Sequence, residues 1–221
     1  MTPDQRRLVE KTAAHAERVL GQEGTGHDWL HVRRVWLNAR RVGRAEGADL
    51  FVVELAALLH DIADWKFHGG DLSAGPKAAR RWLLSLGAGA GTAERVARVV
   101  AQVSYKGAKV ADSADSLEAA VVQDADRLDA LGAVGIARTF AYGGSKGRAI
   151  YDPAVKPVLH ASSKAYSTST APTLNHFYEK LLLLKGRMKT RTGRRLAAER
   201  HRFMELFLRR FYAETGARPP R

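Results

Sequence analysis

The chain contains no cysteine among its 221 residues. This absence excludes disulfide bonds and thiolate-ligated zinc, so a bound metal would depend on nitrogen and oxygen ligands. No apolar stretch approaches the ~20 residues that a helix needs to cross a bilayer. The N-terminal segment Met-Thr-Pro-Asp-Gln-Arg-Arg lacks the apolar core of a secretory signal. We therefore expect a soluble, cytoplasmic protein with no membrane partner.

Acidic residues are in deficit, with 23 Asp and Glu against 36 Lys and Arg, which gives a formal charge of +13. A basic surface attracts phosphate-bearing partners, whether nucleotides or nucleic acid. The positive residues are scattered at helical spacing beside apolar ones, and most of them are expected to be solvated faces. The sequence therefore favours a small phosphorylated substrate, and dedicated nucleic-acid binding is the minority interpretation.

Strand patterns are also missing, because apolar residues recur at helical period and no alternating run occurs. The pattern predicts one all-α domain over residues 1–221, with a core over about 24–142 and C-terminal helices over 173–214. Asp49, Ser73 and Thr92 are the expected N-caps of three helices. The helices are expected over residues 4–20, 27–46, 50–63, 73–86, 91–104, 115–142, 173–184 and 192–214.

Residues 143–172 carry little helical pattern. A loop of this length in a compact domain is usually functional or disordered. With Lys146, Arg148, Lys156 and Lys164 it could fold over an anionic substrate as a lid, and an irregular surface loop is an equally good interpretation.

Histidine and aspartate occur together at three separated places. His31 lies in G-H-D-W-L-H-V-R-R-V, the pair His60-Asp61 in L-A-A-L-L-H-D-I-A-D-W, and Asp126 in V-V-Q-D-A-D-R-L-D-A-L-G-A. Imidazole nitrogen and carboxylate oxygen are the ligands of divalent ions such as Mn²⁺, Fe²⁺, Co²⁺, Ni²⁺ and Zn²⁺, which can activate water. A lone His-Asp pair would more simply cap a helix end, but matching residues on two other predicted helices favour a metal site.

On two of the three predicted helices, spacing does not decide which residue is the metal ligand. His27 stands four residues before His31, so both would share one helical face. On the third helix the apolar stripe leaves Asp124 pointing away, whereas Asp126 and Asp129 both fall near the stripe. Periodicity thus excludes Asp124 and does not separate the other two.

The order His…His-Asp…Asp resembles the HD-domain metal-dependent phosphohydrolases, a superfamily named for the adjacent pair. The chain looks like a bacterial branch believed to act on nucleotides, and the similarity covers most of residues 24–214. The strings that carry it are G-H-D-W, F-V-V-E-L-A-A-L-L-H-D-I-A-D-W-K-F, Q-D-A-D-R-L-D-A-L-G-A-V-G-I-A-R and N-H-F-Y-E-K-L-L-L-L-K.

The resemblance implies the all-α HD fold and one divalent ion bound by four residues. The family's H-x-x-R-V and A-D-[RK]-L segments match His31 and Asp126, which complete the set with His60 and Asp61. Asp129 is then expected to pair with a basic group or to support the site.

The resemblance also implies further roles. Asp64 follows the His-Asp pair at the spacing of the catalytic carboxylate in similar alarmone hydrolases and nucleotidases, often Glu there, and would act as general base and then acid. His27 and Asp28 could orient ligands or contact substrate. The candidate substrate-binding residues are His27, Arg34, Lys66, Asp71, Arg127 and Lys146.

The expected activity is metal-dependent hydrolysis of a phosphate ester or anhydride, with a (deoxy)nucleoside triphosphate as preferred substrate. Mn²⁺ is the preferred cofactor, and Mg²⁺, Co²⁺, Ni²⁺, Fe²⁺ or Zn²⁺ would also fit. The alternatives are a signalling phosphodiesterase or alarmone hydrolase, and a basic nucleic-acid-binding module with an inactive HD site. A homodimer is compatible with each of them.

Overall fold

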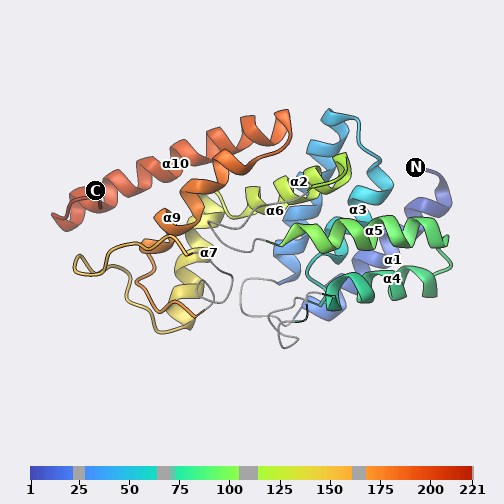
Figure 1. Ribbon diagram of the computed structural model, residues 1–221, viewed down its shortest axis with the longest axis horizontal. Coiled ribbons are helices and arrows are strands. Elements are labelled where there is room, and N and C mark those ends of the chain that lie inside the picture. The colour runs from blue at the N-terminus through green and yellow to red at the C-terminus, as the bar shows by residue number, and fades with distance from the viewer. Residues whose placement is uncertain (22–27, 64–70, 72, 105–113, 161–167, 221) are drawn as a thin grey trace. The chain divides into compact units, whose positions relative to one another are not determined.

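A computed structural model describes residues 1–21, 28–63, 71, 73–104, 114–160 and 168–220. Every regular element within these residues is a helix, which confirms the all-α prediction (Figure 1). None of the described helices is long and apolar enough to cross a membrane. The elements are α1 (Pro3–Leu20), α2 (Trp29–Glu46), α3 (Leu50–Leu59), α4 (Ala74–Ser85), α5 (Ala90–Val103), α6 (Leu117–Asp129), α7 (Gly132–Ser145), α9 (Asn175–Glu179), the 3₁₀ helix η2 (Leu181–Arg187) and α10 (Arg191–Thr215).

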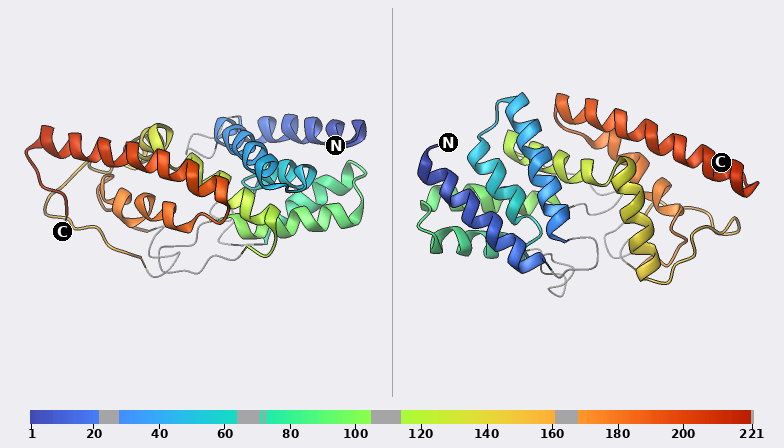
Figure 2. Two further views of the ribbon diagram at one scale, coloured as in Figure 1. Left: turned by 90° about the horizontal axis from the view of Figure 1, so that it is seen from above. Right: turned by 180° about the vertical axis from the view of Figure 1, so that it is seen from behind.

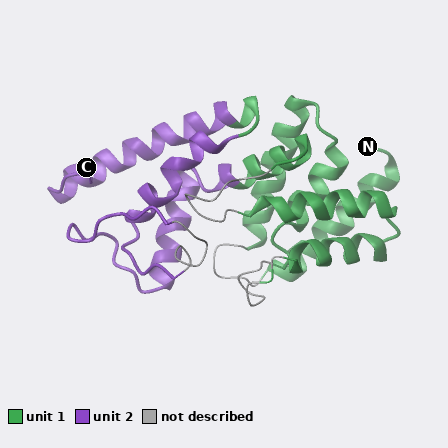
Figure 3. Cartoon of the chain, in the orientation of Figure 1, with its two compact units in different colours: residues 1–104, 113–126, 189–193 green, residues 105–112, 127–188, 194–221 purple. Residues whose placement is uncertain are grey.

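The chain divides into two compact units, which Figure 3 colours separately. Unit 1 comprises residues 1–104, 113–126 and 189–193, and unit 2 comprises residues 105–112, 127–188 and 194–221. The expectation of a single domain over the whole chain stays a prediction.

Helix α3 is the centre of unit 1. Its sequence is apolar on nearly all sides, and each residue from Phe51 to Leu59 is buried. Helices α1, α2 and α5 pack against it, and α4 lies beside α5 (Figure 2). A core helix surrounded in this way gives a rigid support for side chains at its C-terminal end.

The predicted helix starts were right in part. The Asp49 carboxylate accepts hydrogen bonds from the backbone N–H of Phe51 and Val52, which confirms this N-cap. Ser73 is the N-cap residue of α4 but makes no capping bond through its side chain. The prediction of Thr92 as an N-cap was wrong, because α5 begins earlier with Gly89 as its N-cap.

Three predicted helices end or break earlier than expected. The helix over 50–63 ends at Leu59 and continues as turns to Ala63. The span 115–142 is two helices, since Gly132, the first residue of α7, adopts a left-handed φ of 74°. The span 173–184 is the short α9 followed by η2, with Lys180 at φ −142° between them.

Unit 2 is built on aromatic side chains. Rings of Phe140, Phe177, Phe207 and Phe211 lie with centroids about 6 Å apart in successive contacts. Residues from the predicted loop over 143–172 belong to this unit, although α7 extends to Ser145 and takes its first three residues.

The described part of that loop is fastened to the segment that leads into α9. The backbone N–H of Thr173 donates to the Ala149 carbonyl at 2.8 Å, and the Asn175 amide donates to the Val155 carbonyl at 3.0 Å. The backbone N–H of Val158 donates to Glu179 at 3.1 Å. A lid function for this loop stays a prediction.

His176 makes the stability of unit 2 sensitive to acid. Burial, with the charges of Lys180, Arg148 and His160, lowers its pKa to about 3. The folded protein keeps the ring neutral, whereas the unfolded chain takes up a proton below an ordinary pKa of about 6.5. The unfolded state then binds more protons, so folding stability falls as the pH drops from about 6.5 towards 3.

We therefore expect His176→Gln to lose part of this acid sensitivity. The free energy of unfolding should fall less between about pH 7.5 and pH 5 in the variant, by about 1–2 kcal/mol. Urea unfolding of both proteins at the two pH values measures this difference. An equal loss of stability in both would contradict the assignment.

Asp124 fastens the start of α10 to α6 within unit 1. This buried carboxylate accepts hydrogen bonds from the backbone N–H of Lys189 at 2.9 Å and of Thr190 at 2.8 Å, and from the Thr190 hydroxyl at 2.7 Å. Gly193 lies directly against this group, and its N–H donates to the Thr190 hydroxyl oxygen at 2.9 Å. A Cβ atom at this position would overlap the Asp124 carboxylate.

Gly193→Ala should therefore destabilise the protein by about 1–3 kcal/mol, because the added methyl group overpacks a buried site. Gly91→Ala on α5 is the matched control, since a Cβ there meets no atom within 4 Å. Thermal unfolding of both variants measures the effect, and equal melting temperatures would contradict it.

Candidate metal centre

Four side chains from three segments of unit 1 come together at one point. His31 Nε2 lies 3.3 Å from Asp61 Oδ2 and 3.5 Å from Asp126 Oδ1. His60 Nε2 lies 3.4 Å from Asp61 Oδ2 and 3.8 Å from Asp126 Oδ1. Ligand atoms of His31, His60 and Asp126 all lie within 4.8 Å of one another, and the described residues contain no second group of this kind.

His31 is held at the first turn of α2. Asp28 is the N-cap of this helix, and its carboxylate accepts the backbone N–H of His31 at 2.7 Å. The His31 side chain is 1% exposed. Asp28 thus fixes the backbone that presents His31, which agrees with the supporting role expected for it.

His60 is held at the C-terminal end of α3 in one tautomer. Its Nδ1 lies 2.8 Å from the Ala57 carbonyl oxygen, an acceptor, so Nδ1 carries the proton. Nε2 is therefore left with a lone pair directed into the cluster. This atom is buried and has no hydrogen-bond partner among the described residues.

A cation at this point would satisfy groups that the protein leaves in an unfavourable state. A carboxylate near the C-terminus of α3, such as Asp61 with 8% exposure, opposes the helix dipole. A lone pair on buried His60 Nε2 and two carboxylates form the mixed donor set of a divalent transition ion. The residues present fit the metal ion implied by the sequence.

The structure separates the aspartates of α6. Asp126 lies in the group of ligand atoms, whereas Asp129 is bonded to Arg138 at 2.9 Å. Pairing of Asp129 with a basic residue was expected. Asp124 does point elsewhere, as the helical period predicted, but into the buried contact with Thr190 rather than into solvent.

The remaining predicted residues are distributed as follows. His27, Asp64 and Lys66 lie outside the described residues. Arg34 is half-buried one turn beyond His31 on α2. Asp71 accepts the backbone N–H and the hydroxyl of Ser73 before α4. Their substrate-binding roles stay predictions.

Two further candidates belong to unit 2. Arg127 is 2% exposed and donates through Nη1 to the Arg187 carbonyl oxygen at 2.7 Å. Lys146 is exposed at the end of α7, where Nζ lies 5.7 Å from the ring centroid of Tyr142. Binding of substrate by these two residues stays a prediction as well.

Sequence reasoning missed the contact that orients His60. A carbonyl three residues earlier, as at Ala57, is available to every residue at a helix end, so no pattern marks it. Asp28 left a readable signal, because aspartate directly before a helical apolar pattern is a common N-cap.

The fold and this centre define a member of a known class. The protein-family model of the HD domain matches residues 29–131, a range that includes all four clustered side chains. A relative of 40% identity spans 91% of the chain. The chain therefore belongs to the HD-domain superfamily of metal-dependent hydrolases.

The relative is YpgQ of Bacillus subtilis, and the matched region covers 90% of it. The crystal structure of YpgQ in complex with ADP has a TM-score of 0.73 at 36% identity and covers 93% of this chain and 97% of YpgQ. The crystal structure of an HD-superfamily hydrolase from Bacillus thuringiensis has a TM-score of 0.75 at 41% identity, and the match covers 97% of this chain and 100% of that protein. The crystal structure of a protein from Lactobacillus plantarum has a TM-score of 0.83 at 35% identity, and the match covers 98% of this chain and 99% of that protein.

Proposed function

We propose that the protein hydrolyses a phosphate ester or anhydride bond of a nucleotide, with a (deoxy)nucleoside triphosphate as preferred substrate and Mn²⁺ as preferred ion. His31, His60, Asp61 and Asp126 would hold the ion. The observation that carries the proposal is the convergence of these four side chains around the unsatisfied Nε2 of His60.

The nucleotide substrate is supported by two observations. The related YpgQ has been crystallised with ADP. The present chain has a formal charge of +13, which favours an anionic substrate. A positively charged protein would favour any phosphate-bearing compound, with or without a base. The ADP complex of YpgQ therefore directs the choice towards a nucleotide.

A divalent ion at this centre would polarise a phosphate oxygen and provide a nucleophile from water at neutral pH. The protein's part is to arrange the donor atoms and to complete the proton transfers. Asp126, with 26% of its side chain exposed, is the most accessible of the four, so substrate would approach on its side. Asp64 would accept a proton from the attacking water and return one to the leaving group. Arg34 and Lys66 would neutralise phosphate charge.

A substrate panel with product identification tests the proposal. The metal-loaded protein is incubated with nucleoside tri-, di- and monophosphates, cyclic dinucleotides and alarmones, and ³¹P NMR identifies phosphate or pyrophosphate. Binding of Mn²⁺ is measured separately by calorimetry. We expect hydrolysis of nucleotides that is lost with a chelator and restored by Mn²⁺. Metal binding without turnover of any nucleotide would contradict the substrate, and absence of metal binding would contradict the site.

A further inference from the structure

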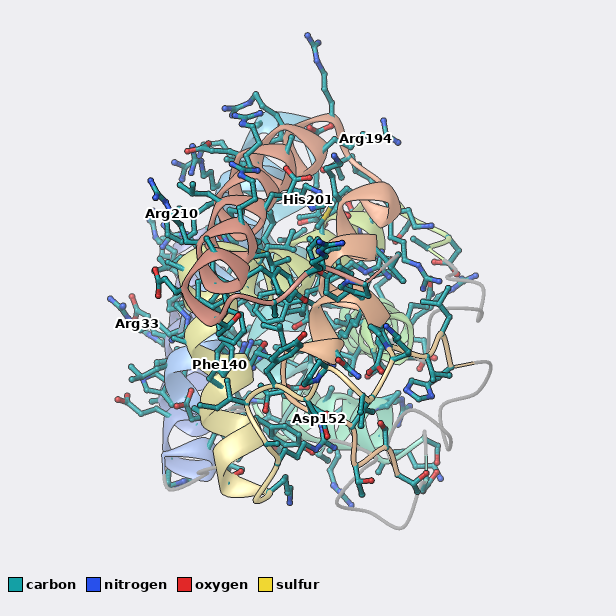
Figure 4. The ribbon with its side chains drawn as sticks, turned by 90° about the vertical axis from the view of Figure 1, so that its left-hand side faces the viewer. Arg33, Phe140, Asp152, Arg194, His201 and Arg210 are labelled. Carbon is teal, nitrogen blue, oxygen red and sulfur yellow. The ribbon has the colours of Figure 1, made fainter. Side chains whose placement is uncertain are left out.

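Helix α10 presents a line of arginines on its exposed side within unit 2. Arg195, Arg202 and Arg209 are all exposed and stand seven residues apart. Seven residues make almost two full turns, so the three side chains leave the helix on one side, about 10 Å apart along its axis. We call these three residues the arginine ridge. Arg210 is exposed beside it, and Figure 4 shows Arg194 and Arg210 projecting outward while His201 lies among the side chains beneath the helix.

The arginine ridge has no acidic partners among the described residues, in contrast to two exposed arginines of unit 1. On α4 and α5, Arg80 lies 3.2 Å from Glu94, and Arg98 lies 2.6 Å from Asp115. Within the described part of the chain, no carboxylate lies within 4.0 Å of a guanidinium nitrogen of the ridge or of Arg210.

The acidic residues of α10 do not interrupt this line. Glu199 and Glu205 stand on its two flanks, and Glu205 lies 3.4 Å from His201 Nε2. The result is a straight row of three arginines about 20 Å long, in which each arginine has Glu199 or Glu205 three or four residues away but forms no ion pair with it.

The other face of α10 limits what the ridge can bind. Leu196, Met204, Leu208 and Tyr212 are buried in the protein, so this helix has no free apolar face to insert into a membrane. Only Phe203 and Leu206, 49% and 43% exposed, add apolar surface beside the ridge. A second copy of the chain would bring a ridge of like charge and a formal charge of +13.

A linear polyanion fits this row. Guanidinium groups bind phosphate through paired hydrogen bonds. A DNA duplex carries one negative charge per about 1.7 Å of its axis when both strands are counted, so several phosphates lie within reach of a ridge of about 20 Å. We propose that the arginine ridge and Arg210 bind the phosphate backbone of a nucleic-acid duplex without selecting base sequence. This surface is separate from the proposed hydrolysis and does not depend on it.

The salt dependence of binding tests the proposal. The full chain is titrated against a fluorescent DNA duplex of about 20 base pairs at about 50 to 200 mM salt, and anisotropy gives the association constant. Four phosphate contacts predict a slope of about −3 to −4 for the logarithm of that constant against the logarithm of salt concentration. R202A/R209A should make this slope less steep by about 2 and weaken binding at every salt concentration.

R80A/R98A is the matched control, because it removes the same charge from exposed arginines that have acidic partners. We expect its slope to equal that of the unmodified protein and both double variants to keep normal metal binding and nucleotide hydrolysis. Circular dichroism checks that each variant is folded.

Four results would overturn the proposal. The first is no binding of the duplex at low salt, and the second is an equal loss of duplex affinity in R202A/R209A and R80A/R98A. The third is tighter binding to vesicles of anionic lipid than to the duplex. The fourth is a dimer of the unmodified protein that dissociates in R202A/R209A. The first three concern binding, and analytical ultracentrifugation detects the last.

Discussion

His60→Ala should eliminate detectable hydrolysis and weaken divalent metal binding by more than about 100-fold. Loss of a residue that only orients a metal ligand costs about 10–100-fold in affinity, and loss of a donor atom removes more. The imidazole is fixed by the Ala57 carbonyl with Nε2 directed into the cluster, so no neighbouring group can replace it. Calorimetry with Mn²⁺ and single-turnover rates on the same preparation measure both effects.

His201→Ala is the matched control for this variant. Both histidines are buried to a similar degree, with 6% and 7% exposure, but His201 belongs to α10 and contacts Glu205. We expect this control to keep normal metal affinity and turnover. A His60→Ala protein that keeps its metal and its rate would refute the centre, whereas equal losses in both variants would reveal general destabilisation.

The second large effect concerns Asp64, whose role rests on the sequence. Asp64→Asn should keep the metal and the fold, because the amide has nearly the same shape as the carboxylate but cannot accept the proton. General acid–base residues contribute about 10²–10⁴-fold, so turnover should fall by a factor in that range with little change in substrate affinity. Metal content and single-turnover rate separate these two properties.

Asp4→Asn serves as control, since this residue is exposed on α1 and has no proposed part in the site. The competing interpretation is that Asp64 pairs with Lys66 or an arginine at the helix end. A turnover within a few-fold of the unmodified protein, with full metal content, would support that interpretation and remove Asp64 from the mechanism.

The sequence predicted a helix start best where a capping residue or the onset of the apolar pattern indicates it. Asp49 caps α3 as expected, and the apolar period placed α1 and α2 within two residues of their observed starts. The break at Gly132 was missed because one glycine inside a long apolar period does not show whether it adopts a left-handed φ. The division after Glu179 was missed for a similar reason, since the apolar run continues through η2.

The cluster could be predicted only in part from periodicity. Helical spacing excluded Asp124 correctly, but it did not distinguish Asp126 from Asp129, because both fall near the apolar stripe. The family pattern selected Asp126, and the structure places this residue beside His31 and His60. The contact of Asp129 with Arg138 depends on the next helix, which local sequence does not position.

The donor atoms of the centre come from positions as distant as 31 and 126, so the binding site exists only in the folded chain. A ligand that binds the native state alone shifts the folding equilibrium by mass action, about 2.7 kcal/mol at a free concentration 100 times its dissociation constant. Metal supply in the cell would then govern how long the protein survives proteases, as well as how fast it works. A cell short of the ion would then hold several-fold less of the folded protein.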